Sequence, residues 1–190
     1  LGISCFFHDS SATLIKNGQI INAVQEERFS RIKHDANFPK NSIKFILKEN
    51  KIKLSEIEFI TFQDKPLLKF NRLLKTYISN APFGYKSFKT SFPTWLTQKI
   101  FQKKFIFKNL LKIDKDFDIN KILFSEHHMA HAASAFYPSP FNEAVVLTMD
   151  GVGEWATTSV SIGRGHDLNM VKEINFPHSL GLLYSAFTYY

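Results

Sequence analysis

The sequence has 190 residues, 44% of them hydrophobic and 22% charged, and a formal net charge of +7. This composition argues against a disordered chain and fits one large globular domain or two small ones. The single cysteine, Cys5, excludes an internal disulfide framework, no apolar run is long enough to cross a bilayer, and the start lacks a signal-peptide pattern. We therefore expect a cytoplasmic protein.

Three strands, a helix and a fourth strand are predicted in the first third of the sequence. Residues 1–7 ("LGISCFF") are apolar and strand-like, and the Asn-Gly pair at 17–18 separates two further strand-like runs, which is a strong hairpin signal. After Pro39, residues 40–50 have the apolar spacing of a helix. Residues 56–63 ("EIEFITFQ") predict the next strand.

The positive charge is concentrated in one stretch. Between Lys65 and Lys121 the sequence has 13 Lys or Arg residues against 3 Asp, a balance of +10, whereas the rest of the chain sums to −3. Basic residues interleaved with aromatic residues can follow a nucleic-acid backbone, but the apolar spacing that begins at Leu67 also suits amphipathic helices. We favour a basic helical insert at about residues 65–121, outside the central sheet and with its lysines exposed.

Strands and helices alternate again after the basic stretch. In chain order the sequence predicts a buried strand (121–125), a helix in the histidine-rich segment, a strand (143–150) and a hairpin-like pair of strands (155–165 and 169–176). This order predicts an α/β domain in which about residues 151–190 begin a second repeat. The sequence stops within an apolar helical pattern, so we expect it to be part of a longer chain.

The segment "SEHHMAHAASAFYPSPF" suggests a metal site. His127 and His131 are four residues apart among good helix formers, so their rings share one helix face, while His128 points about 100° away. Asp150 ends an apolar strand, and two imidazoles with one carboxylate suit iron, zinc or manganese. The alternative is a pair of buried histidines bonded to backbone or water, with an aspartate that only forms a turn.

Two strand ends carry polar residues next to turns of small residues. Gly151 and Gly153 follow Asp150 and permit positive φ and close approach of a phosphate, and His8 and Asp9 end the first strand just before two serines. Such paired strand ends are typical of a nucleotide cleft in an open α/β sheet. His8 could equally bond a turn.

Four ordered motifs resemble the N-terminal part of the O-carbamoyltransferases typified by nodulation protein U and the enzymes that carbamoylate antibiotics. The resemblance covers about residues 1–63 and 121–190, and the basic stretch between them matches nothing in the family pattern. The motifs are "GISCFFHDSSATLIKNGQIINAVQEERFSRIKHD", "HHMAHAASAFYPSPF", "TMDGVGEWATTS" and "FPHSLGLLYSAFTY".

The resemblance implies an α/β domain of the actin-like ATPase and sugar-kinase superfamily (ribonuclease H-like), with a mixed sheet and flanking helices. It also implies a YrdC-like C-terminal domain, absent from this chain, that makes carbamoyl-adenylate from carbamoyl phosphate and ATP. The present domain would then transfer the carbamoyl group to a hydroxyl of a small-molecule acceptor. A nucleotide- or RNA-binding module, related to the tRNA threonylcarbamoyl-adenosine synthases, is the alternative function.

Carried over by motif, His127, His131 and Asp150 match the ligands of a divalent metal, usually Fe²⁺, and His8 matches a catalytic histidine. A further ligand in the family is an aspartate from outside this sequence. As a base, a neutral His8 would help a hydroxyl to attack.

The remaining candidate residues flank these groups in sequence. Gly151 and Gly153 would leave room for the nucleotide. After the third strand, Glu27, Arg28 and Arg31 lie near the expected acceptor, or are ordinary charges at a strand end.

Overall fold

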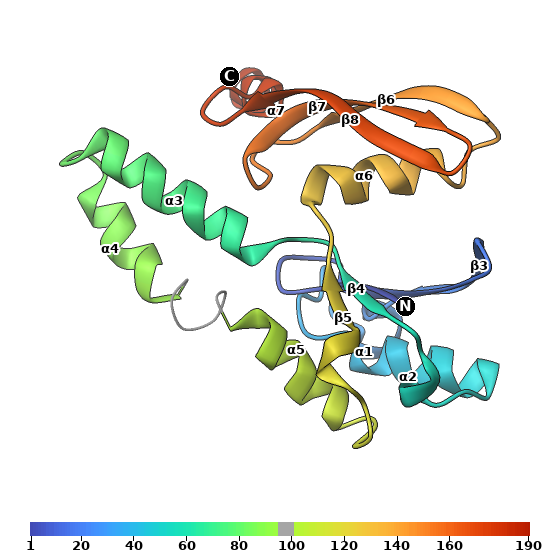
Figure 1. Ribbon diagram of the computed structural model, residues 1–190. Coiled ribbons are helices and arrows are strands. Elements are labelled where there is room, and N and C mark those ends of the chain that lie inside the picture. Colours follow the sequence, from blue (N-terminus) through green and yellow to red (C-terminus); the bar gives the residue numbers. More distant parts are fainter. Residues whose placement is uncertain (95–100) are drawn as a thin grey trace. The chain divides into compact units, whose positions relative to one another are not determined.

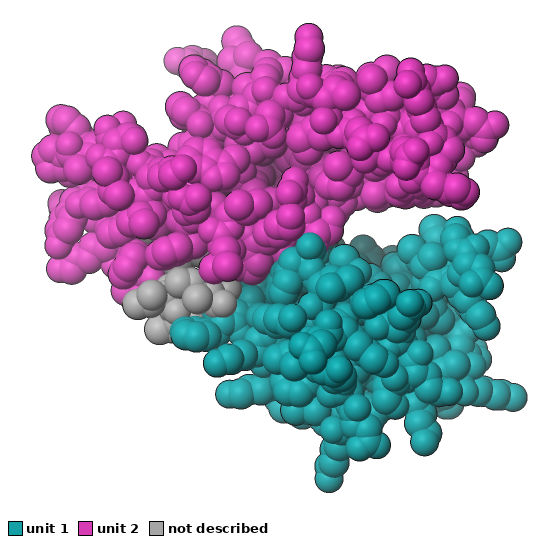
Figure 2. Space-filling model, viewed as in Figure 1, with its two compact units in different colours: residues 1–63, 96–124 teal, residues 64–95, 125–190 magenta. Residues whose placement is uncertain are grey.

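The computed structural model describes residues 1–94 and 101–190, and the chain divides into two compact units (Figure 2). Unit 1 comprises Leu1–Gln63 and Leu96–Phe124, and unit 2 comprises Asp64–Trp95 and Ser125–Tyr190. Each unit contains one β-sheet and one cluster of buried apolar side chains.

Unit 1 is built on a mixed five-stranded sheet in the order β3-β2-β1-β4-β5 (Figure 1). Strands β1, β2 and β3 pair antiparallel, whereas β4 and β5 run parallel to β1. The mixed α/β architecture predicted from the sequence is therefore confirmed. The strands are β1 (Gly2–Ser4), β2 (Ser11–Lys16), β3 (Gln19–Gln25), β4 (Ile60–Phe62) and β5 (Ile122–Phe124).

The hairpin between β2 and β3 forms at the predicted Asn-Gly pair. Asn17 has φ 52° and Gly18 has φ 77°, and the flanking residues Lys16 and Gln19 are paired across the strands. Two successive positive φ angles are the pattern of a type I′ turn, which matches the twist of the strands. The local sequence thus determines the register at this end of the sheet.

Helix α2 (Lys40–Asn50) packs its apolar side against the first sheet. Ile43 and Ile46 are fully buried in the same cluster as Ile60 of β4. The other helical segments of unit 1 are α1 (Glu27–Ser30), α5 (Gln102–Leu111) and the 3₁₀ turns η1 (Leu54–Glu56) and η3 (Ile119–Lys121). The carboxylate of Glu26 accepts hydrogen bonds from the first turn of α2, which stabilises the start of that helix.

Unit 2 contains an antiparallel sheet of β6 (Glu143–Met149), β7 (Ala156–Arg164) and β8 (Asp167–Asn175). Helix α6 (His127–Phe136) lies along one face of this sheet (Figure 1). Phe136 packs so closely that a Cβ at Gly163 would lie 2.5 Å from its ring. The second sheet already includes β6, so it begins before residue 151, where we expected the second repeat to start.

Three more helices belong to unit 2: α3 (Pro66–Asn80), α4 (Tyr85–Thr94) and α7 (Leu180–Thr188). Helices α3 and α4 form a hairpin in which the rings of Tyr77 and Phe88 stack with centroids 4.0 Å apart. None of the described helices is long and apolar enough to pass through a membrane.

The basic stretch is helical where the structure describes it, as predicted, and residues 65–94 and 101–121 contain no strand. Its helices are divided between the units, since α3 and α4 belong to unit 2 and α5 to unit 1. The prediction that its lysines are all exposed is wrong for Lys65, Lys69, Lys103 and Lys121, which are half-buried. Lys69 is paired with a carboxylate at the start of α3, which explains its burial.

Candidate metal centre and the His8 loop

Asp150 and two histidines come from secondary-structure ends that unit 2 brings together. Asp150 directly follows β6, and its backbone N–H donates to the carbonyl of Thr157 on β7 at 2.8 Å, which continues the pairing of the two strands. His127 is the first residue of α6, and His131 lies one turn further along the same helix. The carboxylate is therefore fixed by the sheet and the two rings by the helix.

The three side chains converge as their spacing predicts. His127 Nε2 lies 2.6 Å from Asp150 Oδ2 and 3.1 Å from His131 Nε2, and one ligand atom from each residue lies within 4.8 Å of the others. Two imidazole nitrogens and one carboxylate oxygen form a donor set suited to iron, manganese or zinc. The residues present therefore fit a divalent metal ion.

The charge state of this cluster follows from its hydrogen bonds. Burial lowers the pKa of His127, but its bonds to Asp150 and Asp64 outweigh burial and raise the pKa to about 9. The bond from His127 in turn lowers the pKa of Asp150 to about 2. Both shifts describe one interaction, in which a protonated His127 pairs with an ionised Asp150 while no metal is bound. Metal binding would displace the proton on Nε2.

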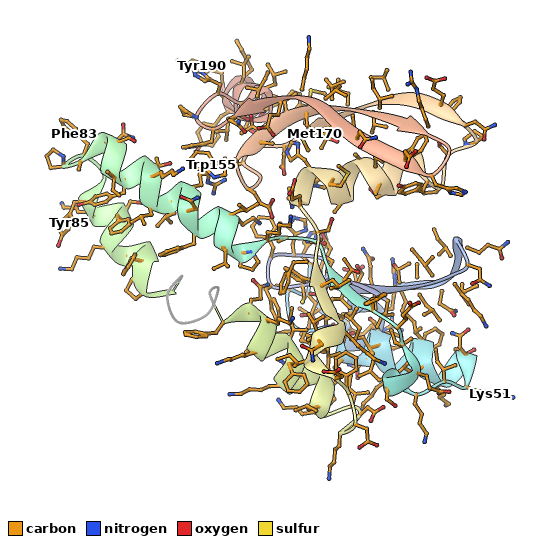
Figure 3. The ribbon with its side chains drawn as sticks, viewed as in Figure 1. Lys51, Phe83, Tyr85, Trp155, Met170 and Tyr190 are labelled. Carbon is orange, nitrogen blue, oxygen red and sulfur yellow. The ribbon has the colours of Figure 1, made fainter. Side chains whose placement is uncertain are left out.

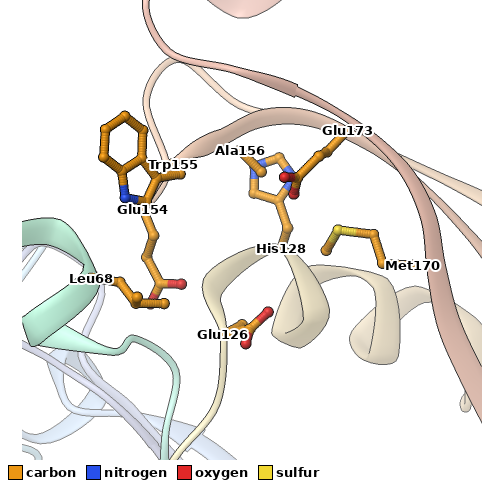
Figure 4. Close-up of a pocket in the computed structure, with 8 residues that line it drawn as sticks. All are labelled: Leu68, Glu126, His128, Glu154, Trp155, Ala156, Met170 and Glu173. Carbon is orange, nitrogen blue, oxygen red and sulfur yellow. The ribbon is translucent and has the colours of Figure 1, made fainter. Parts of the chain in front are cut away.

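His128 lies apart from this cluster, as its angle on the helix predicts. Its side chain is buried, and Nδ1 lies 2.9 Å from Ser159 Oγ on β7. Nε2 has no hydrogen-bond partner among the described residues. His128 lines a cavity of about 190 Å³ together with Glu126, Glu154 and Met170 (Figure 4). A cavity of this volume has room for ordered water that could bond this nitrogen.

Two residues of the centre were not predicted from the sequence. Asp64 Oδ1 lies 2.7 Å from His127 Nδ1, and Asp64 Oδ2 lies 2.6 Å from Lys69 Nζ. Burial raises the pKa of Asp64, but His127 and Lys69 outweigh it and leave the pKa below its usual value. The available signal was that Asp64 lies two residues after a strand that ends at Phe62, while Asp150 directly follows β6.

Glu154 is a third unpredicted residue of this region. Its side chain is buried and accepts a hydrogen bond from the backbone N–H of Lys65, and burial raises its pKa. The loop is held at a second point, because Arg72 Nη1 on α3 donates to the carbonyl of Gly153 at 2.5 Å. The start of α3 therefore holds the loop that follows Asp150.

The glycines of this loop do not have the conformation that we expected. Neither Gly151 nor Gly153 has a positive φ, since the positive-φ glycines are at other positions. A Cβ at Gly153 would lie 2.5 Å from the carbonyl oxygen of Ala156 and 3.1 Å from the His128 ring, whereas a Cβ at Gly151 would meet only Leu182, at 3.9 Å. Gly153 is therefore required by close packing.

His8 belongs to unit 1 and shares a carboxylate with a second histidine. His8 Nδ1 lies 2.7 Å from Asp9 Oδ2, and His34 Nδ1 lies 3.0 Å from Asp9 Oδ1. Both rings are open to solvent, with exposed side-chain fractions of 59% for His8 and 63% for His34. The sequence indicated His8 but not its pairing with His34, which is 26 positions further along the chain.

Strained backbone surrounds this cluster. Phe6, Asp9 and His34 have φ of 71°, 49° and 56°, in the left-handed region that residues other than glycine rarely adopt. Two backbone hydrogen bonds brace the two loops, from Phe6 N to Ala36 O and from Ser10 N to Asp35 O, both 2.8 Å long. Such strain tends to occur at functional sites, which supports a role for the loop.

The three charged residues after β3 occupy different environments. A carboxylate oxygen of Glu27 accepts a hydrogen bond from His34 N at 3.3 Å, so Glu27 belongs to the His8 loop. Arg28 lines a shallow hollow over β2 and β3. Arg31 ends α1 with φ 59°, and its backbone N–H donates to the carbonyl of Glu27.

Comparison with known proteins determines the family. Residues 1–190 match the family model described as the carbamoyltransferase N-terminus. The chain belongs to the carbamoyltransferase family. The resemblance inferred from the four motifs is thereby confirmed, and the match also covers the basic stretch, which we had expected to lie outside the family pattern.

Curated relatives match nearly the whole chain. It is 55% identical to the uncharacterized protein sll1178 of Synechocystis over 100% of the chain and 31% of that protein. It is 32% identical to the nodulation protein NolNO of Sinorhizobium fredii over 94% of the chain and 25% of NolNO. It is 27% identical to the uncharacterized protein MJ1051 of Methanocaldococcus jannaschii over 99% of the chain and 29% of that protein. The chain thus spans only about a third or less of each relative.

Proposed function

We propose that the chain is part of an O-carbamoyltransferase that moves a carbamoyl group from carbamoyl-adenylate to a hydroxyl of a small-molecule acceptor. The observation that carries this proposal is the convergence of His127, His131 and Asp150 in a chain of the carbamoyltransferase family. Carbamoyl phosphate and ATP would be the co-substrates, and a YrdC-like domain elsewhere in the full-length protein would form the adenylate.

His127, His131 and Asp150 would hold a divalent metal, for which Fe²⁺ is our proposal because the donor set of two nitrogens and one oxygen suits it. The bound ion would act as a Lewis acid toward the phosphate oxygens of the adenylate. The protein contributes a fixed geometry, since the strand end holds Asp150 and one helix face holds both rings. On the same loop Gly151 would leave the backbone open to the nucleotide, whereas the space beside Gly153 is taken by Ala156 and His128.

His8 is our proposed base for the acceptor hydroxyl. An ionised carboxylate only accepts hydrogen bonds, so the contact with Asp9 places a proton on His8 Nδ1. A neutral ring then has its lone pair on Nε2, where it can take the proton of an attacking hydroxyl. Glu27, Arg28 and Arg31 are our proposed contacts for the acceptor, on the segment that follows β3.

The fold superfamily is also a proposal. Strands β1, β2 and β3 form an antiparallel meander at one side of the first sheet, and β6, β7 and β8 form a second such meander. Helices follow each meander in the chain, α1 and α2 in unit 1 and α7 in unit 2. This repetition supports the two-repeat plan of the actin-like ATPase and sugar-kinase superfamily.

The direct test is an assay of the full-length protein with ATP, carbamoyl phosphate, Fe²⁺ and a panel of hydroxylated acceptors. We expect AMP release that depends on both co-substrates, and a carbamoylated product of at least one acceptor class. The matched control is the double variant His127→Ala/His131→Ala, which should keep its fold but lose bound metal and transfer. Full transfer by this metal-free variant would reject the proposed site.

An RNA-binding module is the second candidate, and one observation favours it. Residues 65–94 contain six Lys or Arg residues and no acidic residue. Phe83 and Tyr85, at the turn between α3 and α4, are 81% and 54% exposed (Figure 3). Tight RNA binding that weakens steeply with salt, together with an absence of carbamoyl transfer, would favour this module.

A further inference from the structure

We propose that Asp64 is a positioning residue of the metal centre, and that it orients His127 through Nδ1 while Lys69 holds Asp64 in place. This inference rests on the proposed function, because it takes His127 as a metal ligand. It adds a role for Asp64 and Lys69, which lie outside the four motifs.

The tautomer of His127 supplies the first argument. Asp64 Oδ1 lies 2.7 Å from Nδ1 of His127, and the carboxylate of Asp64 is paired with a lysine, so it acts as an acceptor. Nδ1 must therefore carry the proton of this contact. The lone pair of a neutral ring is then on Nε2, the atom that faces Asp150 and His131. Asp64 thus selects the tautomer that a metal ligand needs.

Both carboxylate oxygens of Asp64 are used, which fixes its orientation. Oδ1 contacts His127, and Oδ2 accepts from Lys69 Nζ at 2.6 Å. The exposed side-chain fractions are 16% for Asp64, 17% for His127 and 23% for Lys69, so little solvent competes for these bonds. The order Lys69, Asp64, His127 is therefore a chain of charge-assisted hydrogen bonds that ends at the metal centre.

Neighbouring contacts fix the backbone that carries Asp64. The backbone N–H of Lys65 donates to the carboxylate of Glu154, and Lys65 Nζ lies 2.8 Å from Glu126 Oε1, just before α6. Arg72 on α3 donates to the carbonyl of Gly153. The first turns of α3 are thus tied to the loop after Asp150 and to the segment before His127. These basic residues have a structural use next to the site, separate from any nucleic-acid surface.

The effect can be measured without catalysis, as the affinity of the full-length, metal-free protein for Co²⁺ alone. Carboxylates that orient a ligating histidine typically contribute about tenfold to a hundredfold to metal affinity. We expect Asp64→Asn to weaken Co²⁺ binding by about that factor, and Lys69→Met to weaken it less, because the carboxylate remains. The matched control is Glu143→Gln, which removes a carboxylate of the same unit that contacts Arg164 and none of the three ligands.

The outcomes separate this inference from the proposed function. If His127→Ala abolishes Co²⁺ binding while both Asp64→Asn and Lys69→Met bind as tightly as Glu143→Gln, the positioning role is wrong and the metal site stands. If His127→Ala binds Co²⁺ normally, the metal site itself is wrong. A purely structural Asp64 would lower the melting temperature of the metal-free protein and leave the affinity of the folded protein unchanged, which also overturns the inference. Lys69→Met provides the test if Asp64→Asn does not fold.

Discussion

Each unit contains a cluster in which histidine rings contact aspartate carboxylates, and the two clusters differ in burial. In unit 2, His127 contacts Asp64 and Asp150 and is 17% exposed, and its supports are a helix, a strand end and a lysine. In unit 1, Asp9 contacts His8 and His34, which are 59% and 63% exposed. The same residue types are therefore held firmly in one place and left accessible in the other.

This difference separates two kinds of chemistry. A metal ligand must keep one geometry, and buried hydrogen bonds on regular elements provide that. A base must meet a substrate and then exchange its proton with solvent, which an accessible ring on a braced loop allows. We therefore expect changes in the unit 2 cluster to alter metal binding and stability, and changes in the unit 1 cluster to alter transfer alone.

The largest expected effect is that of His8→Asn in the full-length protein. Transfer from pre-formed carbamoyl-adenylate should fall by about a hundredfold to ten-thousandfold, because a general base contributes about that much. Metal content and the rate of adenylate formation should stay near wild type. A parallel loss of both rates would indicate misfolding, and two unchanged rates would remove His8 from the mechanism.

Asp9→Asn tests whether the carboxylate in the exposed cluster orients the base. We expect transfer to fall by about tenfold to a hundredfold, less than for His8→Asn, because the imidazole remains but is less well placed. The measurement is the transfer rate as a function of pH, with His34→Gln as the control that keeps the contact between Asp9 and His8. Co²⁺ affinity should be unchanged, and a loss of metal binding would contradict the division of roles between the clusters.

Two neighbouring glycines test how tightly the unit 2 cluster is packed. Gly153→Ala should destabilise the protein by about 1–3 kcal/mol, because the new methyl would meet the carbonyl of Ala156 and the ring of His128. Gly151→Ala should be nearly neutral, since a Cβ there meets only Leu182 at van der Waals distance. The measurement is the melting temperature of each variant in thermal unfolding. Equal melting temperatures would show that the packing around Gly153 is not critical.

Local patterns predicted most of the elements and part of the centre. The i, i+4 histidines and the aspartate after an apolar strand need only helix and strand geometry, so His127, His131 and Asp150 could be found from the sequence. Asp64 also follows a strand, two residues after the end of β4, whereas Asp150 directly follows β6. Asp64 was not found because it lies between the motif region, which ends at about residue 63, and the basic stretch, which begins at Lys65.

Other features depend on contacts between distant residues and could not be predicted. The pairing of β6 with β7 rather than with the first sheet depends on a register between separate segments. Glu154 is buried and accepts a hydrogen bond from the backbone N–H of Lys65, 89 positions earlier in the chain. The sequence also cannot distinguish a glycine required for positive φ from one required for packing, which is why our expectation for Gly153 was wrong.

The smallest expected effect is the pH dependence of stability in the metal-free protein, and it should come from the unit 2 cluster. Folding raises the pKa of His127 from 6.5 to about 9, so its stabilising contribution is complete below pH 6.5 and is lost as the pH rises through 9. Folding lowers the pKa of Asp150 to about 2, so its contribution is present above pH 3.8 and is lost as the pH falls toward 2.

Both losses concern one ion pair, and solvent reaches it, because 17% of His127 and 30% of Asp150 is exposed. We therefore expect a change of only about 1 kcal/mol on the alkaline side. The measurement is the melting temperature between pH 6 and 10 for the metal-free protein and for His127→Gln, since other groups titrate in the same range and only the difference reports on His127. A constant difference over this range would show that His127 is not protonated in the folded, metal-free state. A difference that shrinks toward pH 9 would confirm the ion pair that metal binding must break.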